Sequence, residues 1–193
     1  MELLPNPQSP SDICLNFQYA CFEGVSLKGA SIHNTIFSWA NFKNSNMEDA
    51  KLTNVIFDNA ILEDVNLKGV NLKKEQRISL IGANLKGANL QGSQIDVDME
   101  NTILNEANLK GCIISNTSFG NSKLLKTKLK GAVISKTNFK NVSLIGANMK
   151  SARFLEVNLA GANLNETNLT GTVIKNSDLS CSSLVKSNLQ NAT

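Results

Sequence analysis

Few side chains in this sequence could support acid–base, nucleophilic or metal chemistry. The chain has one histidine, His33, and four cysteines, Cys14, Cys21, Cys112 and Cys181. A single histidine excludes a multi-histidine metal site, and a Cys–His pair would need His33 beside Cys14 or Cys21. The cysteines form no Cys-x-x-Cys pair, which favours a reduced compartment over a disulfide framework.

Three acidic residues alternate in one short segment, Asp96, Asp98 and Glu100. They could hold a weakly bound cation, but the other ligands and the glycine of an EF-hand loop are absent. The sequence also has no phosphate-binding glycine-rich loop and no nucleophile elbow. We therefore predict a protein that is not an enzyme and that needs no cofactor or metal.

The elements that position these residues come from a repeat of five. Apolar residues recur at every fifth position from Phe17 to Leu72, from Leu85 to Ile95 and from Leu104 to Leu189, at 33 positions in all. The chain as a whole is only 41% hydrophobic. A period of five fits neither an amphipathic helix nor an ordinary strand, and a strict internal repeat predicts a solenoid.

Each repeat contains one extended piece and one turn. The central apolar residue and the small residue two positions before it are predicted to point inward, and the polar residues between repeats to point outward. Glycine often follows two positions later, as at Gly69 and Gly111, where it suits a turn with positive φ. This arrangement gives a corner every five residues and places Cys21 and His33 on opposite sides of the rod.

The repeat resembles the motif of the pentapeptide-repeat family, A(D/N)LXX. Ala83-Asn84-Leu85 and Ala162-Asn163-Leu164 are examples, and the resemblance covers residues 15–189 apart from two interruptions. It implies an all-β fold, a right-handed quadrilateral β-helix with 20 residues per coil. The spacing of Phe17, Phe37 and Phe57 independently supports a coil of that length. The number of repeats then predicts about eight coils.

The expected organisation is an N-terminal cap over residues 1–13 and a single β-helix over residues 14–193. Interruptions near 73–79 and 96–101 are expected to protrude as loops or bulges, and loops on a rigid scaffold often carry function. Lys74 and Arg77 in the first interruption are candidate partner contacts. An uncapped last coil predicts end-to-end association or a partner that covers this end.

Basic residues gather in one part of the chain. Residues 107–155 contain nine basic side chains and no acidic one, although the whole chain has a net charge of only +3. Lys110, Lys130 and Lys150 are 20 apart and should form a ladder on one face, which Lys128 shares. Lys123 and Lys126 should lie on the adjoining face and corner.

Like charges on neighbouring strands are unfavourable, so this arrangement suggests an anionic partner. The candidates are an acidic protein surface, a nucleic-acid backbone or an anionic membrane. The alternative is that the lysines are solvated and keep the rod soluble.

Tyr19 and Trp39 are the only tyrosine and tryptophan, and they too are 20 residues apart. They should stack on one outer corner, and exposed aromatic residues are favoured interface anchors. In the alternative, residues 3–5 fold over them as part of the cap.

These features favour a scaffold that presents a rigid surface to another protein. The resemblance suggests a second possibility, a DNA-mimicking modulator of a type II topoisomerase, although only the N-terminal part is acidic. A translocated bacterial effector and a binder of anionic ligands through the lysine face are further alternatives. No secretory leader and no long apolar run is visible, so we expect a bacterial cytoplasmic protein without a membrane span.

Overall fold

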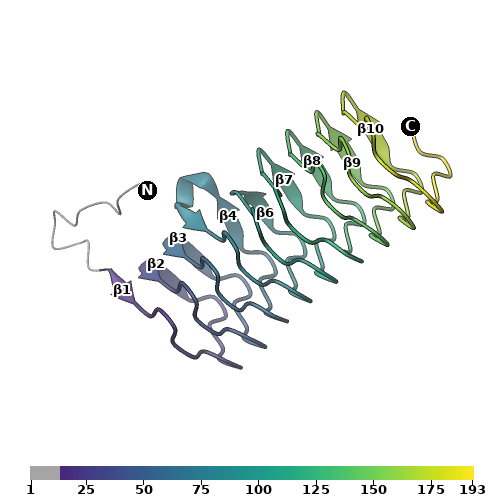
Figure 1. Cartoon of the computed structure of the whole chain (residues 1–193). Helices are drawn as coiled ribbons and strands as arrows, with labels where there is room; N and C mark the ends of the chain where they lie inside the picture. Colours follow the sequence, from purple (N-terminus) through teal and green to yellow (C-terminus); the bar gives the residue numbers. More distant parts are fainter. Residues whose placement is uncertain (1–13) are drawn as a thin grey trace.

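The chain forms a rod of stacked coils, described here from a computed structural model for residues 14–193 (Figure 1). The N-terminal cap expected over residues 1–13 lies outside the described residues. The predicted all-β solenoid of about eight coils is confirmed, and residues 14–193 contain no α-helix.

Ten short strands and one 3-10 turn make up the regular structure. The elements are β1 (Leu15–Asn16), β2 (Ser31–Ile36), β3 (Lys51–Ile56), β4 (Asn71–Lys73), the turn η1 (Lys74–Gln76), β5 (Ile78–Ser79), β6 (Gln94–Asp96), β7 (Ile113–Ser115), β8 (Val133–Ser135), β9 (Arg153–Leu155) and β10 (Val173–Lys175). Their pairing is parallel, in one sheet ordered β1-β2-β3-β5 and another ordered β10-β9-β8-β7-β6-β4.

Each coil has four sides, which we number by the central residues that they carry. The first face carries Phe37, the second Phe42, the third Met47 and the fourth Leu52. Backbone bridges join equivalent residues of successive coils on the second and third faces along the whole described rod. Equivalent residues of regular coils are 20 positions apart, as for the side chains of Asn46 and Asn66.

The central residues fill the interior of the rod. Phe37 stacks on Phe57 with ring centroids 5.3 Å apart, and Phe119 stacks on Phe139 at 4.7 Å. The small residues that precede them, such as Ala40, are buried as well. Because equivalent side chains stack along the axis, each coil buries apolar surface only against its neighbours.

The first interruption is an insertion at the corner between the fourth and first faces. Three residues, Lys74–Gln76, form η1, and Arg77 follows in the left-handed conformation with φ 51°. The next coil is therefore displaced, so that Asn89 bonds to Asn66 across 23 positions. Leu80, 1% exposed, already takes a central position, so the repeat resumes one step earlier than predicted.

The second interruption is not a protruding loop, and that expectation was wrong. The coil is one residue short instead: Asn108 bonds to Asn89 across 19 positions, and Ile95 pairs with Ile114. Val97 and Met99 are 6% and 0% exposed, in the small and central positions of a regular repeat. This side of the coil has four residues instead of five, so Met99 does not fit the five-residue spacing.

Candidate functional site: the lysine surface

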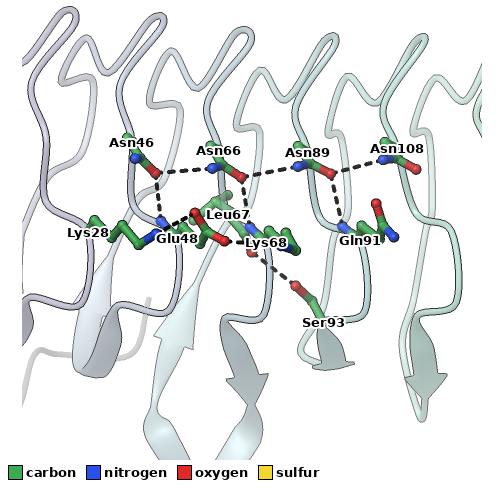
Figure 2. A network of polar contacts seen from close by, with 10 residues as sticks. All are labelled: Lys28, Asn46, Glu48, Asn66, Leu67, Lys68, Asn89, Gln91, Ser93 and Asn108. Atoms are coloured by element: carbon green, nitrogen blue, oxygen red, sulfur yellow. Dashed lines mark hydrogen bonds and ion pairs between the residues drawn. The ribbon is translucent and has the colours of Figure 1, made fainter.

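The third face carries a row of asparagine side chains, shown in Figure 2. Asn66 donates from Nδ2 to Oδ1 of Asn46 at 3.1 Å, Asn89 donates to Asn66 at 3.1 Å, and Asn108 donates to Asn89 at 3.0 Å. Each Oδ1 also accepts the backbone N–H two residues later, at 3.2 Å for Lys110. This row fixes the backbone beside it, so the side chains of the next outward row are held in register.

In the N-terminal coils, positive and negative side chains of this next outward row balance one another. Glu48 lies between Lys28 and Lys68, and both Lys Nζ atoms are 3.1 Å from its carboxylate (Figure 2). Hydrogen bonds from Lys28 and Lys68 hold the pKa of Glu48 below its usual value. Exposed ion pairs stabilise a fold only weakly, but here they remove the repulsion between two lysines on one side of the rod.

The same row turns wholly basic further along. Backbone bonds from Gly92 N to Lys110 O, from Gly111 N to Lys130 O and from Gly131 N to Lys150 O, each 3.0 Å, continue the row coil by coil. These three lysines form the lysine ladder. All are exposed, and within residues 14–193 none of them has an ion-pair partner.

Three further lysines extend the ladder into what we call the lysine surface. Lys128 takes the place of an asparagine in the third-face row, bridging to Asn108 and Asn148. Lys123 lies on the second face, and Lys126 lies at the corner between the two faces with φ 55°. The structure thus places all six predicted lysines, Lys110, Lys123, Lys126, Lys128, Lys130 and Lys150, on two adjoining faces and their shared corner.

Lys74 and Arg77 lie apart from this surface, at the corner between the fourth and first faces. They line a hollow of about 220 Å³ between the inserted turn and the shortened coil, together with Asp96 and Asp98. Among residues 14–193, no ion pair joins these two cations to the two carboxylates. The hollow is small and open, and the hydroxyl of its lining residue Ser79 donates a hydrogen bond to the Asp58 carboxylate.

Tyr19 and Trp39 stack as predicted, with ring centroids 6.3 Å apart and an interplanar angle of 12°. They are 74% and 53% exposed and have positive φ, a conformation that bulky side chains adopt at a cost. They lie at the N-terminal end of the first face, away from the lysine surface. The proposed cover by residues 3–5 falls outside the described residues.

The described residues contain no group of three His, Cys, Asp or Glu side chains that could hold a metal ion. Asp98 and Glu100 instead accept hydrogen bonds from the backbone N–H and the hydroxyl of Ser118, at 3.1 and 2.9 Å. Burial raises the pKa of the Cys112 thiol to about 12, so this cysteine is a packing residue and not a nucleophile at neutral pH.

Exposed aliphatic residues beside the lysine surface were missed by the sequence reasoning. Ile113 and Val133 on the fourth face are 50% and 44% exposed, and Leu125 on the second face is 37% exposed. They stand at outward positions where earlier coils carry polar residues, such as Gln94. A comparison of outward positions at intervals of one coil could have found them.

The family model for pentapeptide repeats matches this chain in eight copies, over residues 14–49, 35–73, 78–121, 95–131, 122–154 and 152–191. The chain belongs to the pentapeptide repeat family. Its fold agrees, because the coils have four sides and five-residue steps. No curated protein matches the sequence.

Solved structures of other pentapeptide repeat proteins are similar at low identity. HetL from the cyanobacterium Nostoc sp. strain PCC 7120, described as involved in heterocyst differentiation regulation, is 22% identical over 92% of this chain and 86% of its own, with a TM-score of 0.35. A trypsin-treated form of QnrB1, a plasmid-mediated fluoroquinolone resistance protein, is 14% identical over 94% and 91%, with a TM-score of 0.43. Rfr23 from the cyanobacterium Cyanothece 51142 is 21% identical over 66% and 86%, with a TM-score of 0.28.

These similarities concern the fold and say nothing of a partner. Within residues 14–193, no helix is long and apolar enough to cross a membrane.

Proposed function

We propose that this pentapeptide repeat protein is a non-enzymatic scaffold whose lysine surface binds an acidic region of another macromolecule. The proposal is carried by a contrast along one row of the third face, in which lysines are paired with an acidic residue near the N-terminus and unpaired further along. Glu48 compensates Lys28 and Lys68, whereas Lys110, Lys130 and Lys150 follow one another without an acidic neighbour in residues 107–155.

Repulsion between these lysines weakens the fold slightly, because like charges on adjacent strands disfavour each other. An acidic partner would relieve that repulsion on binding and would gain three or more charge-assisted contacts. The rigid rod supports such binding, since its backbone bonds fix the lysine spacing before the partner arrives and ordering costs are small.

The DNA-mimic alternative gains less support. A DNA-like surface needs a dense array of uncompensated negative charge. In the acidic N-terminal half, Glu48 is paired with two lysines and Glu63 lies 3.3 Å from Lys43. Positive charge therefore interrupts the acidic surface where a mimic would need it unbroken.

Location and assembly belong to the same proposal. Cys14, Cys21 and Cys181 are exposed and unpaired, which fits a reducing compartment, and we infer that the protein works in the cytoplasm. Association through the C-terminal coil remains an additional proposal, for which Val185 and Leu189, 60% and 47% exposed, offer apolar surface.

The test compares two sets of three neutralised lysines. K110Q/K130Q/K150Q removes the lysine ladder, and K28Q/K43Q/K68Q removes the same charge from the paired lysines. Proteins captured from a nuclease-treated lysate by the unaltered chain should be lost with the first variant and kept with the second. Equal capture by the first variant and the unaltered chain would overturn the proposal, and so would loss with both variants.

A further inference from the structure

The fourth face, next to the lysine ladder, carries aliphatic side chains in the coils that bear the ladder. Ile113 of β7 and Val133 of β8 are register partners. Arg153 of β9 is the next residue in that register, and Leu155 lies two positions further along β9, as the register partner of Ser135. The side chains of Ile113, Val133 and Leu155 are 50%, 44% and 43% exposed. The three strands lie side by side in the C-terminal half of the rod (Figure 1).

The outward position of Ile113 and Val133 is polar in the earlier coils. Lys51, Asn71 and Gln94 precede Ile113 on this face, and all three are exposed. The change from Gln94 to Ile113 occurs between the same two coils as the change from Gln91 to Lys110 in the row that contains the lysine ladder. Two rows on different faces therefore change together. One becomes lysine at Lys110, and the other becomes aliphatic at Ile113 and Val133 before Arg153 follows.

The two rows are separated only by a corner. Three positions separate Lys110 from Ile113 and Lys130 from Val133, so the backbone between each pair spans at most about 10 Å. Successive coils are about 4.8 Å apart along the rod. We call the six side chains Lys110, Lys130, Lys150, Ile113, Val133 and Leu155 the amphipathic strip.

We propose that the partner of the amphipathic strip is a protein segment that carries carboxylates with aliphatic side chains beside them. The inference rests on the proposed function, because it takes the lysine ladder as a contact surface and names the class of partner. Charge complementarity requires the acidic groups, since residues 107–155 contain no acidic side chain. The three exposed aliphatic side chains require apolar groups, because burial of their exposed area would favour binding.

A nucleic acid would use only half of this surface. Its phosphates would pair with the lysines, but the sugar–phosphate backbone offers nothing to aliphatic side chains. The lysine surface also lacks aromatic residues on which bases could stack: within residues 107–155 the aromatic residues are Phe119, Phe139 and Phe154, and all three are buried.

Three fluorescent probes separate these possibilities by fluorescence polarisation. The first is a peptide of four Glu-Leu-Ser repeats, the second is the same peptide with serine in place of leucine, and the third is a short DNA duplex. We expect the leucine peptide to bind about tenfold more tightly than the serine peptide, since burying part of several aliphatic side chains supplies at least that factor.

Substitutions then locate the contact. I113T/V133T/L155T should abolish the advantage of the leucine peptide and leave the other two probes unchanged. The matched control V25T/I61T/I81T removes three exposed aliphatic side chains elsewhere and should have no effect. Threonine is β-branched and therefore suits strand positions, and circular dichroism checks that each variant is folded.

The outcomes distinguish this inference from the proposed function. If K110Q/K130Q/K150Q weakens all three probes but I113T/V133T/L155T weakens none, the lysine ladder binds anions and the amphipathic partner is refuted. If the lysine variant changes nothing, the proposed function itself fails. Duplex DNA that binds more tightly than the leucine peptide would assign the strip to nucleic acid. Concentration-dependent dimers that the lysine variant disrupts would assign it to a second copy of the chain. Either assignment overturns the inference.

Discussion

Deletion of residues 74–76 should leave the rod intact and make it more stable. The deletion joins Lys73 to Arg77 and restores a five-residue step from Leu72 to Leu80. Arg77 already has φ 51°, the left-handed conformation found at other corners, so the shortened chain needs no new backbone conformation there. The structure thus predicts that these three residues are dispensable for the fold.

The expected gain follows from what the inserted turn contributes. None of its residues is buried, and ordering three residues costs about 3–6 kcal/mol. The deletion removes the 3.2 Å hydrogen bond from Thr53 Oγ1 to Gln76 Oε1 and the 3.0 Å bond from Arg77 N to Lys74 O, worth about 1 kcal/mol each. We therefore expect the free energy of unfolding to rise by about 1–4 kcal/mol.

Urea unfolding followed by far-UV circular dichroism measures this change. Deletion of residues 135–137 is the control, because it removes the equivalent corner from a regular coil and leaves Ile134 two positions from Phe139. That variant should lose several kcal/mol or fail to fold, since one side of the coil can no longer close. A loss of more than about 2 kcal/mol on deletion of 74–76 would refute the reasoning, because it would mean that the turn supports the fold.

Three other predictions concern single positions. Gly161→Ala should destabilise the fold more than Gly111→Ala by about 1 kcal/mol in urea unfolding, because both glycines have positive φ but only at Gly161 would the new Cβ collide with Asn141; equal losses would contradict this. A thiol reagent at pH 8 should modify the three exposed cysteines, while Cys112, with its pKa of about 12, stays unmodified until urea unfolds the protein; four equal rates in the native state would exclude the buried thiol. The pKa of Glu48 is lowered from 4.5, so its contribution to stability is present above the unfolded-state pKa and lost as pH falls through the folded value. The difference in melting temperature between Glu48→Gln and the unaltered chain should therefore shrink from pH 7 to pH 3, and a difference that grows on acidification would contradict the assignment.

Most of the fold could be predicted because the inward residues of a solenoid obey a single rule. The stacking of Phe37 on Phe57, and of Tyr19 on Trp39, follows from a spacing of one coil alone. The two interruptions were harder, because a search with a step of five reports an inserted turn and a missing residue in the same way. Met99 shows the difference, since only its burial in the structure reveals a shortened side.

The candidate surface was predictable in its placement and not in its chemistry. Spacing alone places Lys110, Lys130 and Lys150 in one row. That row extends back to Glu48 through registers of 23 and 19 residues. The two ion pairs of Glu48 depend on side-chain geometry. The exposed aliphatic side chain of Ile113 is recognised from its exposed area. The five-residue pattern concerns inward positions and does not report exposure at outward ones.

The backbone pairing gives the rod different mechanical properties on its two sides. Bridges run without a break along the second and third faces, whereas β3 pairs with β2 and β5 and leaves β4 to begin a separate sheet. The rod thus has a continuous spine under the lysine surface and a seam on the side of the inserted turn. Bending strain would concentrate at the seam and change the width of the hollow beside Lys74, while the spacing of the lysines along the spine would stay fixed.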